Sequence, residues 1–243
     1  MQSFRKEWYL VDLGLTDYRT AWALQLRLVE AKREDVLKAD VVLLGEHPAV
    51  FTLGRRGGLS NLKVSQDFLA GRGIEVLHVE RGGDITFHGP GQLVMYPVVG
   101  LRTLGLGVLS FVEKLEEIMI RSLADWGIKG NRNSMNRGAW VDEGKIGSVG
   151  IAVRRAVSFH GLALNVNTDL EPFTWVNPCG LHQVSITSMK QMLGKGVPMQ
   201  EVKEAATRHT GDVFAIQSAT VSIQELEGEL GLPTYRPFSA NMT

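Results

Sequence analysis

The only cysteine of this 243-residue chain is Cys179, in the loop-like run 174–180. One thiol can form neither an internal disulfide nor a thiolate metal site, so any chemistry at this residue is nucleophilic or redox. The neighbouring Pro178 and Gly180 predict a turn that holds the sulfur outside a helix. Taken alone, a free cysteine is more often an inert packing residue than a nucleophile.

A lysine with small neighbours forms the second candidate group. Lys145 begins the run 145–150, in which glycines and small residues leave room around the side chain. We interpret this run as a tight glycine-rich turn whose lysine amine points into a pocket. The alternative is an exposed hairpin lysine, which is the usual state of this residue type.

The densest glycine-rich run extends from Arg81 to Gln92 and contains four glycines in twelve residues. Glycine allows the backbone to approach a ligand closely and to adopt positive φ. Arg81, Thr86, His88 and Gln92 add charge and hydrogen-bonding groups. The run lacks the Gly-x-x-x-x-Gly-Lys-Ser/Thr pattern of a phosphate loop and does not open a helix. A glycine-rich hairpin with a structural histidine is the alternative interpretation. A further strand-like run, 158–167, contains His160-Gly161, which we expect to interrupt regular strand pairing.

Apolar patterns predict the elements that position these groups. Strands are expected over 8–13, 40–44, 50–53, 75–80 and 93–99, and antiparallel hairpins over 138–167. Helices are expected over 17–38, over 109–123 with a stop at Gly127, and over 202–209 ending at Gly211. A capping-box pattern at Ser222 opens a last short helix. No repeat or long linker divides the chain, so we expect one α+β domain over residues 1–243.

The composition is that of an ordinary soluble protein, with 44% hydrophobic and 21% charged residues. The 26 basic and 26 acidic residues balance, which argues against a global electrostatic footprint for nucleic acid. The most apolar stretch, 93–101, is far shorter than the roughly 20 residues that span a bilayer. The N-terminal residues lack the apolar core of a signal peptide. We therefore expect a cytoplasmic protein.

The combined motifs resemble the lipoyl(octanoyl) transferases, which move an octanoyl group from acyl carrier protein to a lysine of lipoyl-dependent enzyme domains. The resemblance extends over about residues 8–215. The spacing from Lys145 to Cys179 (179 − 145 = 34) agrees with the lysine–cysteine pair of that family. The matching segments are Gly45-Glu46-His47-Pro48, Thr52-Leu53-Gly54-Arg55, Arg81-Gly82-Gly83, Thr86-Phe87-His88, Gly91-Gln92, Lys145-Ile146, Ser148-Val149-Gly150, Phe159-His160-Gly161-Leu162-Ala163, Asn165 and Asn177-Pro178-Cys179-Gly180.

The resemblance implies a biotin/lipoate protein ligase-like α+β fold, with mixed, mostly antiparallel sheets flanked by helices. It implies Cys179 and Lys145 as catalytic residues, with no metal and no cofactor. The implied donor is octanoyl-acyl carrier protein, and the implied acceptors are lipoyl domains of 2-oxoacid dehydrogenase complexes and the glycine cleavage H protein. The implied substrate-binding residues are Arg81, Gly82, Gly83, Asp84, Ile85, Thr86, Phe87, His88, Ser148, Val149, Gly150, Gly161, Leu162 and Ala163.

Two other functions are compatible with parts of the sequence. An ATP-dependent lipoate or octanoate ligase activates its acid as an adenylate and needs no acyl-cysteine, so Cys179 with Lys145 argues against it. The run 54–57 is distantly similar to the glycine-arginine loop of biotin ligases, which is weak support for nucleotide use. A non-catalytic module that binds carrier proteins is the third interpretation. His88 and His160 have an alternative role as core histidines.

Overall fold

The computed structural model describes residues 7–133, 136–177 and 184–231 of the chain. Most strands in these ranges belong to one large sheet. Its members are β1 (Glu7–Leu15), β2 (Asp40–Glu46), β6 (Gln92–Val98), β7 (Gly138–Val141), β8 (Gly144–Arg154), β9 (Val157–Asn165), β10 (Ser185–Ile186) and β11 (Gln217–Thr220). A smaller sheet contains β3 (Val50–Leu53), β4 (Glu75–His78) and β5 (Ile85–His88).

The helices of the described residues differ widely in length. The α-helices are α1 (Tyr18–Arg33), α2 (Gln66–Ala70), α3 (Leu101–Leu104), α4 (Val108–Ala124), α5 (Met189–Leu193), α6 (Met199–Phe214) and α7 (Ile223–Glu229). Two 3-10 turns, η1 (Leu59–Asn61) and η2 (Glu171–Trp175), lie in loops. Within this part of the chain, no helix is both long enough and apolar enough to span a membrane.

Both sheets mix strand directions. The large sheet has the order β10-β8-β9-β6-β2-β1-β11, and β7 also pairs with β8. Its centre is antiparallel (β2–β6, β6–β9, β8–β9), whereas β1 runs parallel to both β2 and β11. In the small sheet β3 is parallel to β4 and antiparallel to β5. This arrangement, with helices beside the sheets, confirms the predicted α+β class.

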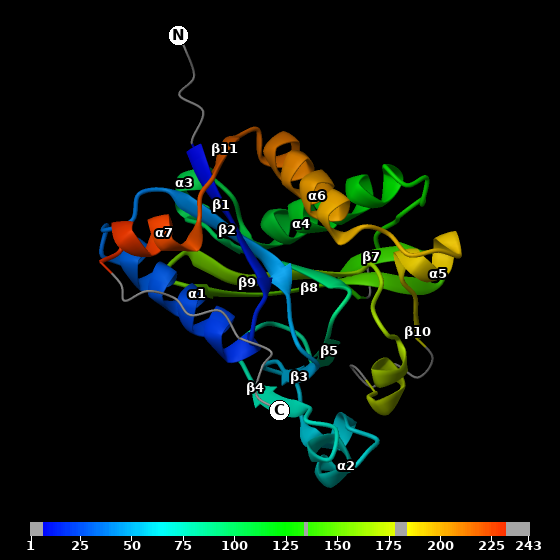
Figure 1. Cartoon of the computed structure of the whole chain (residues 1–243). Coiled ribbons are helices and arrows are strands. Elements are labelled where there is room, and N and C mark those ends of the chain that lie inside the picture. The colour runs from blue at the N-terminus through cyan, green and yellow to red at the C-terminus, as the bar shows by residue number, and fades with distance from the viewer. Residues whose placement is uncertain (1–6, 134–135, 178–183, 232–243) are drawn as a thin grey trace.

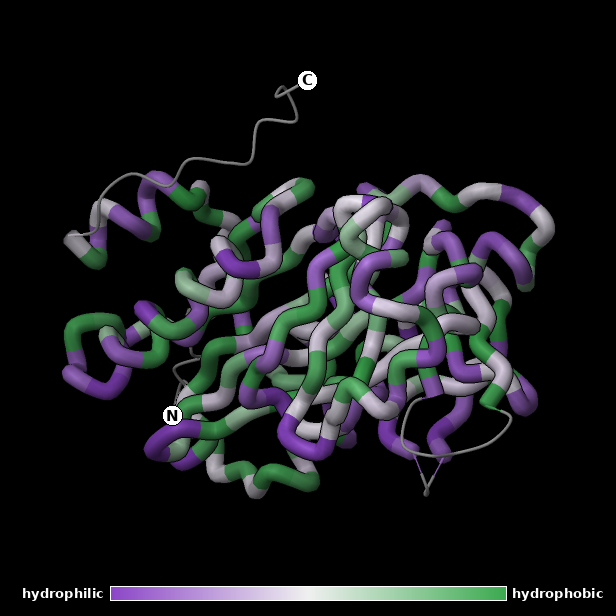
Figure 2. The backbone as a smooth tube through the Cα atoms, turned by 90° about the horizontal axis from the view of Figure 1, so that it is seen from below, coloured by the Kyte–Doolittle hydropathy of each residue, from purple (hydrophilic) through white to green (hydrophobic). Residues whose placement is uncertain are grey.

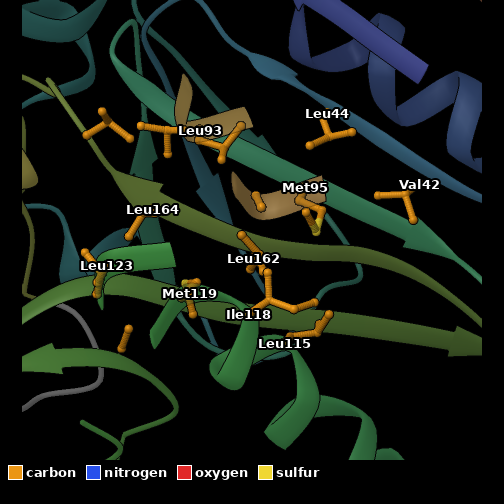
Figure 3. Close-up of a cluster of buried hydrophobic side chains, with 14 of the residues drawn as sticks. Val42, Leu44, Leu93, Met95, Leu115, Ile118, Met119, Leu123, Leu162 and Leu164 are labelled. Atoms are coloured by element: carbon orange, nitrogen blue, oxygen red, sulfur yellow. The ribbon is translucent and has the colours of Figure 1, made fainter. Parts of the chain in front are cut away.

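Helices cover both faces of the large sheet, with α4 and α6 on one face and α1 and α7 on the other (Figure 1). The α4 side chains Leu115, Ile118, Met119 and Leu123 recur at helical spacing and are buried. They pack toward strand residues such as Leu162 in the cluster of Figure 3. Along the tube in Figure 2, hydrophobic stretches run through the central strands and hydrophilic stretches occupy many turns.

The opposite face is covered by α1, which begins at Asp17. The Asp17 carboxylate accepts a hydrogen bond from the backbone N–H of Thr20, as an N-cap does. The buried stripe of α1 contains Ala21, Leu24 and Leu28, which pack on strands β6 and β9. Because alternate residues of a strand face opposite sides, each central strand supplies side chains to both cores.

The first helix ends earlier than predicted. α1 stops at Arg33 rather than at residue 38, and Asp35 takes a left-handed φ of 63°. A right-handed helix cannot continue through that conformation. The N–H groups of Val36 and Leu37 instead bond to the carbonyl of Ala31 and close the helix end.

The predicted end of α6 at Gly211 is also wrong. The helix continues to Phe214 and closes at Ala215, whose φ is 52°. The Phe214 ring lies 4.9 Å from the ring of Trp8 and 5.8 Å from that of Phe111. Packing of this partly buried ring against the core offsets the cost of a glycine inside a helix, which is about 1 kcal/mol.

The run that begins at Lys145 is a strand rather than the predicted turn. It belongs to β8, which pairs with β7 on one side and with β9 from Gly147↔Leu164 to Arg154↔Val157. The turn lies earlier, at Asp142, whose φ is 51°. Pairing with the neighbouring strands β7 and β9 outweighs the local preference of the glycines for a turn.

Several other predictions are confirmed. The 138–167 region forms the antiparallel strands β7, β8 and β9. α4 ends before Gly127, which has a positive φ of 71°. The capping box of α7 is present, because Glu225 N–H donates to Ser222 Oγ while Ser222 N–H donates to the Glu225 carboxylate.

Candidate active site

A cleft of about 570 Å³ brings together most of the residues predicted to bind substrate. Its lining comes from α1, α4, β5, β6, β8, β9, β10 and η2 and from loop residues near 56, 81–84, 136–137, 176 and 184. The predicted residues that line it are Arg81, Gly82, Gly83, Asp84, Ile85, Thr86, His88, Lys145, Ser148, Val149, Gly150, Gly161, Leu162 and Ala163. Segments far apart in the sequence therefore share one cavity.

Phe87 lies elsewhere. Its ring packs 5.2 Å from Phe51 and 5.6 Å from Phe173, within the core of the small sheet. Side chains alternate along β5, so Thr86 and His88 face the cleft while Phe87 faces the other side of the strand. Sequence reasoning treated the segment as a unit and did not apply this alternation.

The predicted catalytic Cys179 lies outside the described residues, together with Pro178 and Gly180. The described residues on either side of that segment include Val176 and Val184, and both line the cleft. The chain thus reaches the wall of the cleft before and after the segment that carries the cysteine.

Lys145 is held beside the 136–138 segment. Its Nζ donates a hydrogen bond of 2.6 Å to Asn136 Oδ1 and lies 5.8 Å from the centre of the Trp140 ring. Gly138 has a φ of 143°, and a Cβ at this position would lie 2.9 Å from Lys145 Cε and overlap the carbonyl oxygen of Gly147. Only glycine fits here, so the segment lies directly against the lysine stem.

A buried carboxylate on α4 anchors this segment. Glu116 is fully buried, and its Oε1 accepts a hydrogen bond of 2.9 Å from the backbone N–H of Gly138. Its Oε2 lies 3.4 Å from Arg137 Nη1 and 3.6 Å from Arg132 Nε. Two guanidinium groups and a backbone donor compensate the buried charge. α4 therefore fixes the position of the residues that contact Lys145.

Arg81 ties the 81–84 loop to the small sheet. Its guanidinium donates to Thr52, from Nε to Oγ1 at 3.1 Å and from Nη2 to the carbonyl oxygen at 2.7 Å, and Nη1 donates to Gly82 O at 3.1 Å. A Cβ on Gly54 would lie 2.5 Å from Gly83 O, which explains the glycine at that position. Arg81 thus shapes the loop that it shares with the cleft wall.

Asp84 also holds this loop. Its Oδ1 accepts a hydrogen bond of 2.7 Å from the N–H of Ile85, and its Oδ2 accepts one of 2.6 Å from Asn61 Nδ2. The N–H of Gly54 donates to the Asp84 carbonyl at 3.1 Å. These contacts join β5 to the loops that follow β3.

Five buried aromatic and imidazole side chains, which we call the imidazole cluster, adjoin the cleft. They share exposures of 6% or less and are Tyr18, His47, His88, Tyr96 and His160. The Tyr18 ring lies 5.0 Å from His47 and 5.6 Å from His88, and the Tyr96 ring lies 6.5 Å from His160. Tyr18, His88, Tyr96 and His160 line the cleft, and His47 packs behind them.

Hydrogen bonds indicate the tautomers of two of these histidines. His47 Nδ1 lies 2.6 Å from the Thr16 carbonyl oxygen, so it donates, and Nε2 accepts from the Tyr96 hydroxyl at 2.7 Å. His88 Nδ1 lies 2.7 Å from Gln92 Oε1 and donates to it. The Gln92 amide is oriented by its own donation to Asn165 Oδ1 at 2.9 Å.

Burial keeps this cluster uncharged. Desolvation lowers the pKa of His47 to about 4 and that of His88 to about 3, the latter with repulsion from His47 and Arg81. Desolvation also raises the pKa of the Tyr18 and Tyr96 hydroxyls above the ordinary value. At neutral pH these four side chains are therefore neutral.

His160 meets a charged neighbour at the edge of the cluster. Burial lowers its pKa, and its Nε2, which has no hydrogen bond among the described residues, lies 3.7 Å from Glu80 Oε2. The polar contact with His160, aided by the charge of Arg154, lowers the pKa of Glu80 to about 2. Trp22 Nε1 donates to the same carboxylate at 3.0 Å. Glu80 is therefore ionised at neutral pH, and Arg154 and Trp22 stabilise its carboxylate.

Sequence reasoning missed several cleft residues. Tyr18 occupies the buried stripe of a helix and Tyr96 lies in a strand that is buried throughout, so neither shows a polar signal in its local pattern. Asn136 lies in a loop two residues before Gly138. It contacts Lys145 only because the β7–β8 hairpin folds the chain back, and no local pattern marks that contact.

Comparison with known proteins identifies the family. Residues 17–211 match the family described as lipoyl protein ligase A/B catalytic domain. The chain belongs to this family. That confirms the family resemblance of the sequence motifs.

Curated relatives cover nearly the whole chain. It is 49% identical over 208 residues to an octanoyltransferase of Desulfotalea psychrophila, covering 85% of this chain and 93% of that protein. It is 47% identical over 222 residues to an octanoyltransferase of Syntrophobacter fumaroxidans, covering 91% of this chain and 97% of that protein.

Solved structures of more distant proteins share the fold. A putative lipoate protein ligase from T. acidophilum with bound lipoic acid superposes with a TM-score of 0.71 at 18% identity, covering 92% of each chain. The biotin protein ligase of Aquifex aeolicus in complex with biotin and ATP gives a TM-score of 0.52 at 13% identity, covering 92% of this chain and 77% of that one. The predicted biotin/lipoate ligase-like fold is confirmed.

Within the described residues, no group of three or more His, Cys, Asp or Glu side chains is arranged to hold a metal ion.

Proposed function

We propose that this protein is an octanoyltransferase that moves an octanoyl group from acyl carrier protein to a lysine of a lipoyl domain. The observation that carries the proposal is the cleft itself. It places Lys145 in one cavity with the 81–86, 148–150 and 161–163 segments, next to residues that flank the Cys179 segment. The relatives named octanoyltransferase support the choice of reaction.

The proposed reaction has two steps. The Cys179 thiolate attacks the donor carbonyl, so that a new carbon–sulfur bond forms and the bond to the phosphopantetheine sulfur breaks. The released thiolate takes a proton. The acceptor amine then attacks octanoyl-Cys179, a carbon–nitrogen bond forms, and the cysteine sulfur leaves. Dividing the transfer in this way lowers each barrier.

Lys145 is proposed to serve both steps. Its ammonium stabilises the Cys179 thiolate, because a nearby cation lowers the pKa of a thiol. It then gives its proton to the leaving phosphopantetheine sulfur. As a neutral amine it accepts a proton from the attacking amine in the second step. The hydrogen bond to Asn136 holds Nζ at the cleft wall for these transfers.

The octanoyl tail is proposed to occupy the part of the cleft next to the imidazole cluster. An aliphatic chain binds best where no charge must be desolvated, and the side chains of this cluster are buried and neutral. Gly161 and Ala163 of β9 and Gly150 of β8 keep the adjacent wall free of bulky side chains.

The proposed partners are octanoyl-acyl carrier protein as donor, and lipoyl domains of 2-oxoacid dehydrogenase complexes and the glycine cleavage H protein as acceptors. Such partners have acidic surfaces, and Arg55 and Arg56 are exposed beside the cleft loop. Arg155 is exposed too, whereas Arg154 pairs with Glu80. We expect the KM for carrier protein to rise with ionic strength.

The proposed location is the cytoplasm, where thiols stay reduced.

Intact-mass analysis after incubation with octanoyl-acyl carrier protein tests the proposal. We expect one octanoyl group on the wild-type chain and none on Cys179→Ala, which should fold normally because the change in volume is small. Transfer to a lipoyl domain should proceed without nucleotide. An absolute requirement for ATP and magnesium would assign the protein to the ligases, and normal transfer by Cys179→Ala would exclude the covalent step.

A further inference from the structure

The side chain of His160 lies on the unexpected face of the large sheet. Along β9, Leu162 and Leu164 pack in the α4 core, whereas Phe159 and Ala163 pack in the α1 core. Strict alternation would place residue 160 with Leu162 and Leu164. Its ring instead lies on the α1 side, 6.5 Å from the ring of Trp22.

A left-handed backbone conformation causes this reversal. His160 has a φ of 54°, although it lies inside a strand whose pairing with β8 is continuous. Non-glycine residues rarely adopt this conformation, and they keep it only where the surroundings hold it. The ladder between β6 and β9 ends at Met95↔Leu162, whereas the pairing of β9 with β8 continues through His160. The predicted interruption of strand pairing is therefore present on the β6 side of β9.

The opposing strand explains why the ladder breaks here. The register Met95↔Leu162 places Pro97 opposite His160. Proline has no N–H to donate to a ladder bond. The Pro97 carbonyl accepts from Ser158 Oγ at 2.8 Å. A Cβ on Gly161 would overlap the Met95 carbonyl oxygen and lie 2.8 Å from Pro97 Cδ, so the next residue must be glycine.

The backbone N–H of His160 donates its hydrogen bond to a buried side chain that does not line the cleft. Gln25 of α1 is 0% exposed, and its Oε1 accepts a hydrogen bond of 2.7 Å from His160 N. Its Nε2 donates to the Ala21 carbonyl at 3.3 Å, which orients the amide oxygen toward β9. The apolar stripe of α1 thus contains one amide, directed at the residue with the left-handed backbone.

We propose that Gln25 is a positioning residue for the acyl site. By binding the backbone N–H of His160, it keeps residue 160 left-handed. It thereby directs the imidazole toward Tyr18, whose hydroxyl lies 3.4 Å from His160 Nδ1. It also sets the course of the chain into Gly161–Ala163, the segment that lines the cleft. This inference rests on the proposed function, because it assigns the wall so shaped to the octanoyl group.

Substitution of Gln25 by leucine tests the proposal. Leucine fills a similar volume and suits a helix, but it cannot accept the hydrogen bond. In a Cys179→Ala background, which cannot be acylated, we expect Gln25→Leu to raise the Kd for octanoyl-pantetheine about tenfold, since small displacements of a binding wall have effects of this order. Exchange of the His160 amide hydrogen should accelerate by a similar factor.

Leu28→Ala is the matched control. Leu28 is fully buried on the same helix face, so its loss destabilises α1 without touching His160. It should lower Tm but leave the Kd and the His160 exchange rate unchanged. An unchanged Kd or exchange rate in Gln25→Leu, or an equal rise of Kd in Leu28→Ala, would overturn the proposal.

A double substitution separates backbone positioning from general packing. Glycine adopts positive φ readily, so Gln25→Leu should raise the Kd much less when residue 160 is already glycine. Equal effects of Gln25→Leu in the His160 and His160→Gly backgrounds would show that Gln25 does not act through this backbone. If Gln25→Leu does not fold, Gln25→Asn, whose amide is one methylene too short to reach, replaces it under the same criteria.

Failure of the proposed function has a different signature. In that case wild-type Cys179 would take no octanoyl group from the carrier protein, whereas the His160 exchange rate would still respond to Gln25→Leu. If acylation occurs and the exchange rate does not respond, the positioning role alone is wrong.

Discussion

The two ends of the cleft differ in charge and in burial. Lys145 lies in a half-buried, ionic setting with Asn136 and the Glu116–Arg137 pair nearby. The imidazole cluster is buried and neutral, with histidine pKa values of about 4 and about 3. His160 is paired with Ile151 on β8, six residues beyond Lys145, which is about 20 Å along a strand.

This difference assigns separate tasks to the two ends. Groups that exchange protons at neutral pH must be able to carry charge, and Lys145 meets that condition. Groups that contact an aliphatic chain should carry no charge, and His88, Tyr18 and Tyr96, which line the cleft, meet that condition. Changes at the first end should therefore affect the chemical step, and changes at the second should affect binding and stability.

The largest expected effect comes from Lys145. Lys145→Ala should lower the rate of transfer by about 10²- to 10⁴-fold, the range of a general acid–base group. It should also raise the pH at which Cys179 reacts with iodoacetamide. Lys145→Arg keeps a cation that cannot release its proton, so alkylation should persist while transfer is lost. Identical alkylation profiles and unchanged transfer in all three proteins would remove Lys145 from the mechanism.

The neutral end should determine the loss of stability in acid. The folded-state pKa of His47 is lowered to about 4, so below pH 6.5 the unfolded chain binds a proton that the folded chain does not. Stability should thus fall as the pH drops from 6.5 to 4, by about 3 kcal/mol for this residue. Urea unfolding at several pH values measures it. His47→Gln should flatten the dependence, and a stability independent of pH between 7 and 5 would contradict the buried neutral histidine.

A smaller effect is expected at Asn136. Asn136→Leu removes the acceptor that holds Lys145 Nζ, and we expect kcat to fall about tenfold while the KM for the donor changes little. Asn131→Ala, an exposed asparagine in the same loop region, is the control. A rise in KM with unchanged kcat would place Asn136 in substrate binding instead.

The last prediction concerns the imidazole cluster, where we expect an effect on stability and none on the pH dependence of catalysis. Tyr96→Phe removes the donor to His47 Nε2 and should cost about 1 to 3 kcal/mol of unfolding free energy, as for a buried acceptor left unpaired. The pH dependence of kcat should stay unchanged, because neither group takes part in proton transfer. A shifted kcat–pH profile in Tyr96→Phe would show that the two ends are coupled and would weaken the division of tasks.

Local sequence determined much of this protein. Helical spacing predicted α1 and α4, because the buried stripe of a helix repeats every 3.6 residues. The capping box at Ser222 depends only on groups three residues apart. The two glycine-rich runs singled out in the sequence, 81–92 and 145–150, both supply residues to the cleft wall. The motifs were also sufficient to predict the family.

Only the tertiary structure decided which side chains meet in the cleft. Alternation along β5 turns Phe87 away, and a break opposite Pro97 reverses the direction of His160. The β8 strand forms because β7 and β9 pair with it, although its glycines favour a turn. Each of these outcomes depends on strand register and on contacts between different elements, and such tertiary contacts leave no periodic signal in the local sequence.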